Sequence, residues 1–202
     1  MKHLRNFIVS AALMLAATAA YAQDVEFGVK GGLAISWITN TVVTGLETVY
    51  PHNNFYAGGF ATINVSDNFI IQPELIYAGK GHSDKSEILG SYNRRLGYIQ
   101  VPVYAGYRFS RKNYTVMAGP EFGYLLNSTT VVNGKPINTT SECRRFNIAL
   151  ALQTNYMVTD NFGVDIKFDW GMNGTFKPNM YADKVSDKGR NVSLQIGVCY
   201  KF

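Results

Sequence analysis

Residues 191–202 read NVSLQIGVCYKF and alternate strictly between two kinds of side chain. The even positions are all apolar and end with Tyr200 and Phe202, whereas the odd positions are polar, charged or small. A period of two residues predicts a β-strand with one apolar and one polar face. Such a strand needs neighbouring strands to pair with and an apolar environment on one face only.

The same alternation recurs in seven earlier segments of the chain. They are residues 25–38, 54–65, 69–80, 96–109, 114–126, 144–157 and 162–171. The second of these is the weakest, because Gly58 and Gly59 interrupt its pattern. The sequence therefore predicts eight strands, each about 10 to 14 residues long and able to cross a bilayer at a tilt.

The connections between these segments alternate in length. Short ones at residues 66–68, 110–113 and 159–161 consist mainly of turn-forming residues. The long ones run through residues 39–53, 81–93, 127–142 and 172–188. An even strand number with short turns at one end and long loops at the other is typical of outer-membrane barrels. We therefore predict an all-β fold: one eight-stranded antiparallel transmembrane β-barrel whose last strand pairs with its first.

A soluble β-sandwich or lipocalin-type barrel is the alternative, and the placement of aromatic residues distinguishes the two. Near the short turns the apolar face carries Phe27, Phe69, Tyr107, Phe109, Tyr114, Tyr156, Phe162, Tyr200 and Phe202. Near the long loops it carries Trp37, Phe55, Tyr77, Tyr124, Phe146 and Trp170, and the middle is mostly aliphatic. Two aromatic girdles around an aliphatic band match a bilayer, because aromatic rings prefer its interfaces.

The start of the chain has the features of a secretory signal. A basic segment with Lys2 precedes an apolar run and an AYA motif at residues 20–22. We expect a signal peptide at residues 1–22 and an outer-membrane β-barrel domain at residues 23–202. No later segment approaches the ~18 apolar residues of a membrane helix. The net charge of +5 does not indicate a nucleic acid partner.

The polar face carries acidic and basic residues in near balance. Eight strands enclose an interior that side chains just fill, whereas a wide channel needs about 16 strands. Charges in such a space must be paired, so we predict an ion-pair network that packs the lumen. Its predicted members are Glu74, Glu121, Asp165 and Asp169 facing Lys30, Arg108, Arg145 and Lys167. Lys80 lies on the same face.

Three arginines fall on the lipid side at the long-loop ends of their strands. These are Arg95, Arg144 and Arg190. Arginine binds phosphate in bidentate fashion, so contact with lipopolysaccharide phosphates is one hypothesis. The alternative is that these side chains extend into water.

We do not expect an enzyme, a cofactor or a metal site. The segment GHSDKSE, residues 81–87, brings His82, Ser83 and Asp84 together in sequence, but catalytic groups are usually spatial neighbours on rigid elements. The chain contains no phosphate-binding loop, zinc-type cysteine spacing or calcium loop. Cys143 and Cys199 fall at opposite ends of the predicted barrel, too far apart for a disulfide.

The chain resembles the small outer-membrane barrels of Bacteroidota, the PorT-like porin family, and more loosely the OmpX type. The resemblance covers residues 25–202 and rests on VKGGLAIS, SDNFIIQPELIYAGKG, YIQVPVYAGYRF, AGPEFGYLL and TDNFGVDIKFDWG. It implies one eight-stranded barrel in the bacterial outer membrane, with periplasmic termini and extracellular long loops. It implies no catalytic residues. In outer-membrane barrels generally, an aromatic last residue such as Phe202, with Tyr200 before it, resembles the signal read by the barrel-assembly machinery.

Three classes of function remain open from the sequence. The first is a structural or surface-interaction barrel that contacts lipid, lipopolysaccharide or surface proteins through its long loops. The second, raised by the resemblance, is an accessory of protein secretion or envelope assembly. The third is a narrow pore or a lipid A-modifying enzyme.

Overall fold

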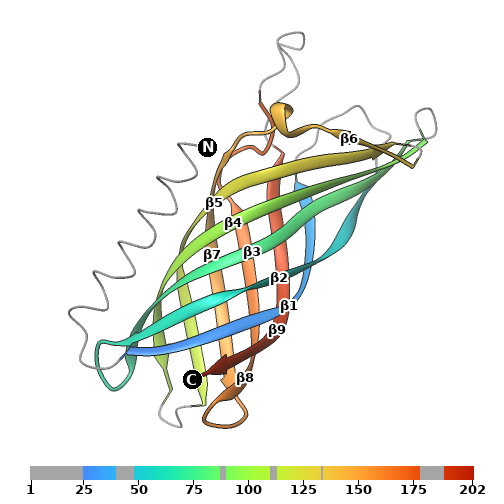
Figure 1. The fold of residues 1–202 in the computed structure, drawn as a ribbon. Coiled ribbons are helices and arrows are strands. Elements are labelled where there is room, and N and C mark those ends of the chain that lie inside the picture. Colours follow the sequence, from blue (N-terminus) through green and yellow to red (C-terminus); the bar gives the residue numbers. More distant parts are fainter. Residues whose placement is uncertain (1–24, 40–47, 87–89, 110–112, 133, 178–188) are drawn as a thin grey trace.

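The computed structural model describes residues 25–39, 48–86, 90–109, 113–132, 134–177 and 189–202; the predicted signal peptide lies outside them. Within these residues eight strands form a closed antiparallel barrel (Figure 1), which confirms the predicted fold class. The strands are β1 (Val25–Thr39), β2 (Thr48–Asn64), β3 (Phe69–Ser86), β4 (Gly90–Arg108), β5 (Tyr114–Val132), β7 (Phe146–Met157), β8 (Phe162–Gly171) and β9 (Arg190–Lys201). A short strand, β6 (Lys135–Asn138), and a 3-10 turn, η1 (Thr140–Glu142), lie between β5 and β7.

The C-terminal strand closes the barrel. β9 pairs with β1 from Gly28↔Lys201 to Thr39↔Arg190, and with β8 on its other side. Each of the eight strands thus has two neighbours, so backbone pairing runs all the way round the barrel. At the end of the seam the Phe202 amide donates a 2.9 Å hydrogen bond to the Phe27 carbonyl. The predicted pairing of the last strand with the first is confirmed.

The two faces of the wall differ sharply in polarity. Leu33 and Leu150 point outward with 69% and 56% of their surface exposed, whereas Glu74 and Glu121 point inward with 0% exposed. A continuous aliphatic band of this kind is unfavourable in water but suits the hydrocarbon core of a bilayer. The arrangement excludes the soluble alternative, which requires its apolar face inside.

An aromatic girdle surrounds the short-turn end. Phe69, Tyr107, Phe109 and Tyr114 follow one another around the wall, with successive ring centroids 5.3, 5.1 and 5.5 Å apart. All four are exposed on the outer face. Their position matches a membrane–water interface, where one end of an aromatic ring is apolar and the other is wet.

The long-loop end differs from the sequence-based expectation. Much of the predicted loops at 81–93 and 127–142 is strand, because β3 continues to Ser86, β4 starts at Gly90 and β5 continues to Val132. Backbone pairing persists there, as in Thr129↔Asn138 between β5 and β6. The apolar alternation stops because no bilayer covers the outer face at this height, whereas the hydrogen-bonded ladder needs no apolar face. β3, β4 and β5 therefore extend to one side beyond β7, β8 and β9 (Figure 1).

One glycine of the seam lies where a larger residue would displace a buried side chain. A Cβ atom at Gly197 would overlap the Gly31 carbonyl oxygen and the Tyr56 hydroxyl, which donates a 2.8 Å hydrogen bond to Asp165. We expect Gly197→Ala to lower the free energy of unfolding by about 2 kcal/mol, since a buried charge loses a hydrogen bond in a crowded site. Urea unfolding of the refolded barrel measures the loss.

A second glycine is the matched control for that substitution. A Cβ atom at Gly59, on the outer face of β2, would meet its nearest neighbour, the Gly28 carbonyl, at 3.5 Å. Gly59→Ala should therefore leave the free energy of unfolding within about 0.5 kcal/mol of the original protein. Equal losses at both positions would contradict the steric argument.

Candidate functional site

A first cluster of charged side chains lies in the half of the lumen nearer the short turns. Lys30 Nζ lies 3.0 Å from Glu74 Oε1 and 3.5 Å from Asp165 Oδ2. The same ammonium donates to Gln153 Oε1 at 2.9 Å, and Tyr56 donates to Asp165 at 2.8 Å. The cluster thus joins side chains from β1, β2, β3, β7 and β8 across the interior. One lysine here holds two carboxylates.

A second cluster lies toward the other end of the lumen. Lys80 Nζ lies 2.6 Å from Asp169 Oδ1 and 3.5 Å from Glu121 Oε1. Lys167 pairs with the other oxygen of Glu121. Neutral groups complete the contacts of these carboxylates: Gln100 donates to Glu121, and Ser193 and Gln195 donate to Asp169. Two lysines here share two carboxylates.

The two clusters fill the interior with paired charges. All seven ionic side chains of the clusters are at most 1% exposed. Groups buried to this extent are costly unless they are paired and hydrogen-bonded, and here each charge has at least one partner of opposite sign. The lumen is therefore a polar core in which ion pairs and hydrogen bonds connect strands that are not neighbours in the wall.

Six of the eight residues predicted for the network lie in these clusters, and two do not. The six are Lys30, Glu74, Glu121, Asp165, Lys167 and Asp169. Arg108 lies at the short-turn end, 3.7 Å from Glu26. Lys80 takes a central place that the predicted set did not assign to it, although its parity in the segment FIIQPELIYAGK indicated the inner face.

Arg145 departs furthest from its predicted place in the lumen network. It is exposed, and its Nη1 donates 3.0 Å hydrogen bonds to the carbonyls of Leu125 and Leu126. β7 begins only at Phe146, after the turn η1. Alternation assigns a face only within a continuous strand, so parity counted back from β7 does not apply to Arg145.

The three arginines predicted to contact lipopolysaccharide have different surroundings. Arg95 is exposed on β4, and Arg190 is half-buried at the first position of β9. Arg144 instead donates from Nε to the Phe176 carbonyl at 2.9 Å. Arg95 and Arg190 therefore remain on the outer wall, whereas Arg144 is bound to the neighbouring chain segment.

Side chains also pack together inside the long-strand end of the barrel. Phe176 packs against a buried cluster of Leu96, Tyr98, Leu125 and Cys143, and its backbone forms a β-bridge with Cys143. The guanidinium of Arg94 lies 4.8 Å above the Phe176 ring and 3.1 Å from Glu142. A cation over an aromatic face is attracted to it, which helps to hold Phe176 against this cluster.

Of the residues weighed as a catalytic group, His82 and Ser83 lie on opposite faces of β3, and the side chain of Asp84 lies outside the described residues. His82 is buried and its ring packs edge-on against Phe176, with centroids 6.2 Å apart. Among the described residues no group of three or more His, Cys, Asp or Glu side chains could hold a metal ion. The described part of the chain also has no helix long and apolar enough to span a membrane.

The two cysteines are free and buried at opposite ends of the barrel. Cys143 lies beside Phe176 at the long-strand end. Cys199 lies near the short turns, opposite Lys30 of β1 and Gly163 of β8 in the strand register.

These features define a small transmembrane β-barrel with a packed polar lumen. A family model described as outer membrane protein beta-barrel domain matches residues 21–177, and the chain belongs to this family. It is a protein of the bacterial outer membrane. This confirms the resemblance to small outer-membrane barrels; the likeness to the PorT-like barrels of Bacteroidota stays a prediction.

Solved structures support the fold. Neisserial surface protein A is similar with a TM-score of 0.56 and 15% identity, and the match covers 89% of this chain and 100% of that one. Ail, the attachment invasion locus protein of Yersinia pestis, is similar with a TM-score of 0.50 and 13% identity, at the same coverage. At such identities the likeness concerns the fold alone. No curated protein sequence matches the chain.

Proposed function

We propose that this protein is a structural barrel with a surface-interaction role, oriented with its termini in the periplasm and its long strands outside the cell. One observation carries the proposal: β3, β4 and β5 extend past the shorter strands as a polar sheet, to which β6 adds a further strand. Extended strands beyond the bilayer contribute no membrane contact, so their use is in the aqueous space outside. The packed lumen favours this role over a narrow pore.

Lipopolysaccharide is the first partner that this orientation suggests. Arg95 and Arg190 lie on the outer wall near the long-strand end, at the height where lipid phosphates would meet it. Guanidinium groups bind phosphate through paired N–H donors. Arg144, held by the Phe176 carbonyl, is expected to contribute less. The accessory role in secretion or envelope assembly, the pore and the lipid A-modifying enzyme remain alternatives.

A double substitution tests the lipid contact. Arg95→Gln with Arg190→Gln should remove about half or more of the extra thermal stability that the barrel gains in lipopolysaccharide-containing nanodiscs over phosphatidylcholine nanodiscs, because a ligand stabilises only through its contacts to the folded state. Stability in phosphatidylcholine should not change.

The matched control removes a charge elsewhere at the same end. Lys135 is exposed at the start of β6, away from the barrel wall, so Lys135→Gln should keep the full gain from lipopolysaccharide. Equal losses in control and double variant would show a non-specific charge effect and contradict the contact.

A further inference from the structure

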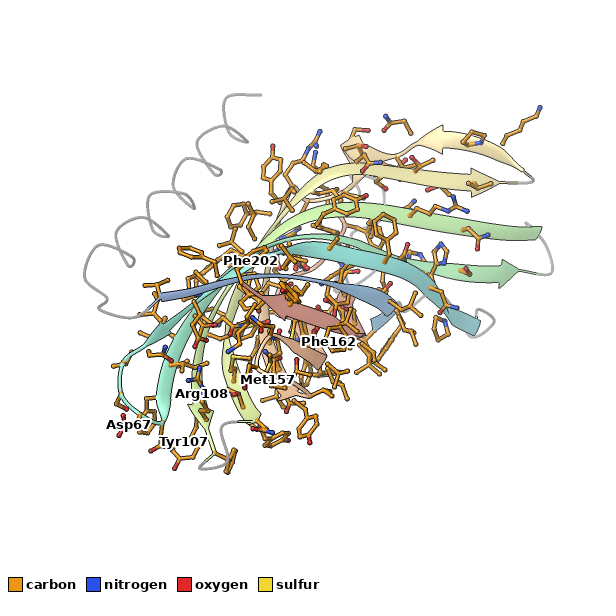
Figure 2. The ribbon with its side chains drawn as sticks, turned by 60° about the horizontal axis from the view of Figure 1, so that its bottom comes forward. Asp67, Tyr107, Arg108, Met157, Phe162 and Phe202 are labelled. Carbon is orange, nitrogen blue, oxygen red and sulfur yellow. The ribbon has the colours of Figure 1, made fainter. Side chains whose placement is uncertain are left out.

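A cavity opens into the barrel at the short-turn end. Its volume is about 670 Å³, and its lining includes Glu26, Asp67, Arg108, Asp160 and Lys201. We call this cavity the vestibule. Figure 2 shows the end that it occupies, with Asp67 on the β2–β3 turn, Arg108 at the end of β4 and Met157 at the end of β7. The volume lies within the range of ~300–1,000 Å³ that is usual for ligand sites.

Among the described residues, the vestibule narrows where it meets the lumen. Beyond Glu26, Arg108 and Lys201 there is a small cavity of about 30 Å³ lined in part by Thr62 and Gln72. Thr62 donates to Gln72 at 2.9 Å, and Gln72 donates to Glu74 at 2.8 Å, so this wall joins the first lumen cluster. A molecule that enters the vestibule therefore meets a floor of charged and hydrogen-bonded side chains, as in a binding pocket.

The floor carries more positive than negative charge. Lys201 Nζ lies 3.0 Å and Arg108 Nη2 3.7 Å from the same oxygen of Glu26. These three side chains are 16% to 30% exposed, so a ligand can reach them. One carboxylate cannot satisfy the five N–H donors of a guanidinium together with the three of an ammonium. The floor can therefore accept a second carboxylate.

The described part of the rim carries two carboxylates. Asp67 on the β2–β3 turn and Asp160 on the β7–β8 turn both line the vestibule and are exposed. Met157 and Val158 add apolar surface to the lining. The described lining of the vestibule thus offers cations at the floor, carboxylates at the rim and some apolar surface.

We propose that the vestibule binds a short peptide that carries both a free carboxylate and a free ammonium group. The carboxylate contacts Arg108 and Lys201 at the floor, and the ammonium contacts Asp67 and Asp160 at the rim. Apolar side chains of the peptide lie against Met157 and Val158. This inference goes beyond the proposed function and does not depend on it, because it concerns only the short-turn end of the barrel.

Calorimetric titration of the full chain in nanodiscs with trialanine tests the proposal. Trialanine should bind, whereas trialanine amide and N-acetyl-trialanine, each lacking one charged end, should bind at least about tenfold more weakly. Glycerophosphoethanolamine, which has the same two charges in a lipid headgroup, should compete poorly. The proposal would be overturned if trialanine and trialanine amide bound equally well, or if trialanine gave no heat of binding. It would also be overturned if glycerophosphoethanolamine bound more tightly than trialanine.

Variants locate the site. Arg108→Gln should weaken trialanine binding about tenfold, while Arg94→Gln, which removes an arginine at the opposite end, should leave it unchanged. Asp67→Asn with Asp160→Asn should weaken trialanine but not N-acetyl-trialanine. If Arg108→Gln does not fold, the comparison of acid and amide on the original protein still decides. Equal effects of Arg94→Gln and Arg108→Gln would contradict the assignment.

Discussion

Replacing Lys80 with methionine is expected to destabilise the barrel by about 3–5 kcal/mol. Lys80 pairs with Asp169 at 2.6 Å and with Glu121 at 3.5 Å, and all three side chains are at most 1% exposed. Methionine has a similar length but no charge, so Asp169 keeps only the neutral donors Ser193 and Gln195. Removing one partner of a buried ion pair is strongly destabilising, because the remaining charge loses its cation at hydrogen-bond distance. Urea unfolding of the refolded protein measures the loss.

Two further variants separate this electrostatic effect from a packing effect. Lys201→Met removes a 3.0 Å pair with Glu26 whose side chains are 21% and 30% exposed, and should cost about 1 kcal/mol or less. Adding Asp169→Asn to Lys80→Met should restore part of the stability, since the unpaired charge is then removed. If Lys80→Met costs no more than Lys201→Met, the network does not stabilise the barrel as its geometry indicates.

Deleting Phe202 is expected to reduce the folded protein in the outer membrane severalfold while changing the stability of the refolded barrel by only about 1 kcal/mol or less. Phe202 is 77% exposed, and its ring touches Tyr200 edge-on with centroids 5.8 Å apart. Its removal costs one backbone hydrogen bond to Phe27 and leaves the seam from Gly28 to Thr39 paired. A large decrease of folded protein in cells would therefore indicate that the barrel-assembly machinery recognises Phe202.

Phe69→Ala is the matched control for this deletion. Phe69 belongs to the aromatic girdle at the same end and is 58% exposed, but it starts β3 rather than ending the chain. Its loss should leave assembly in cells near normal. Quantifying folded protein in membrane fractions by heat-dependent gel mobility distinguishes the two variants. Similar assembly defects in both would mean that the girdle, rather than the last residue, is recognised.

Most of the fold could be predicted because its strands obey a period of two. The alternation in residues 191–202 and in seven further segments depends on one face meeting lipid and the other the lumen. Where the bilayer ends, that constraint ends too, and the sequence no longer marks the strands: β3 to Ser86 and β6 at Lys135–Asn138 were expected to be loop. Backbone hydrogen bonds hold these strands together, and such bonds require no alternation of apolar residues in the sequence.

The sequence could predict which charged residues face the lumen, but not which of them form ion pairs with each other. Parity assigned Lys30, Glu74, Glu121 and Lys167 to the interior, and all four lie there. It misplaced Arg145, because the turn η1 interrupts the strand before it.

The sequence by itself therefore determined the strand pattern, the two faces and the membrane environment of this protein, since these follow from local periodicity. Only the tertiary structure decided which lysine meets which carboxylate, that Phe176 packs against a buried cluster at one end, and that Glu26, Arg108 and Lys201 line a pocket at the other. These contacts join residues far apart in the chain, and the tilt and register of the closed barrel bring them together.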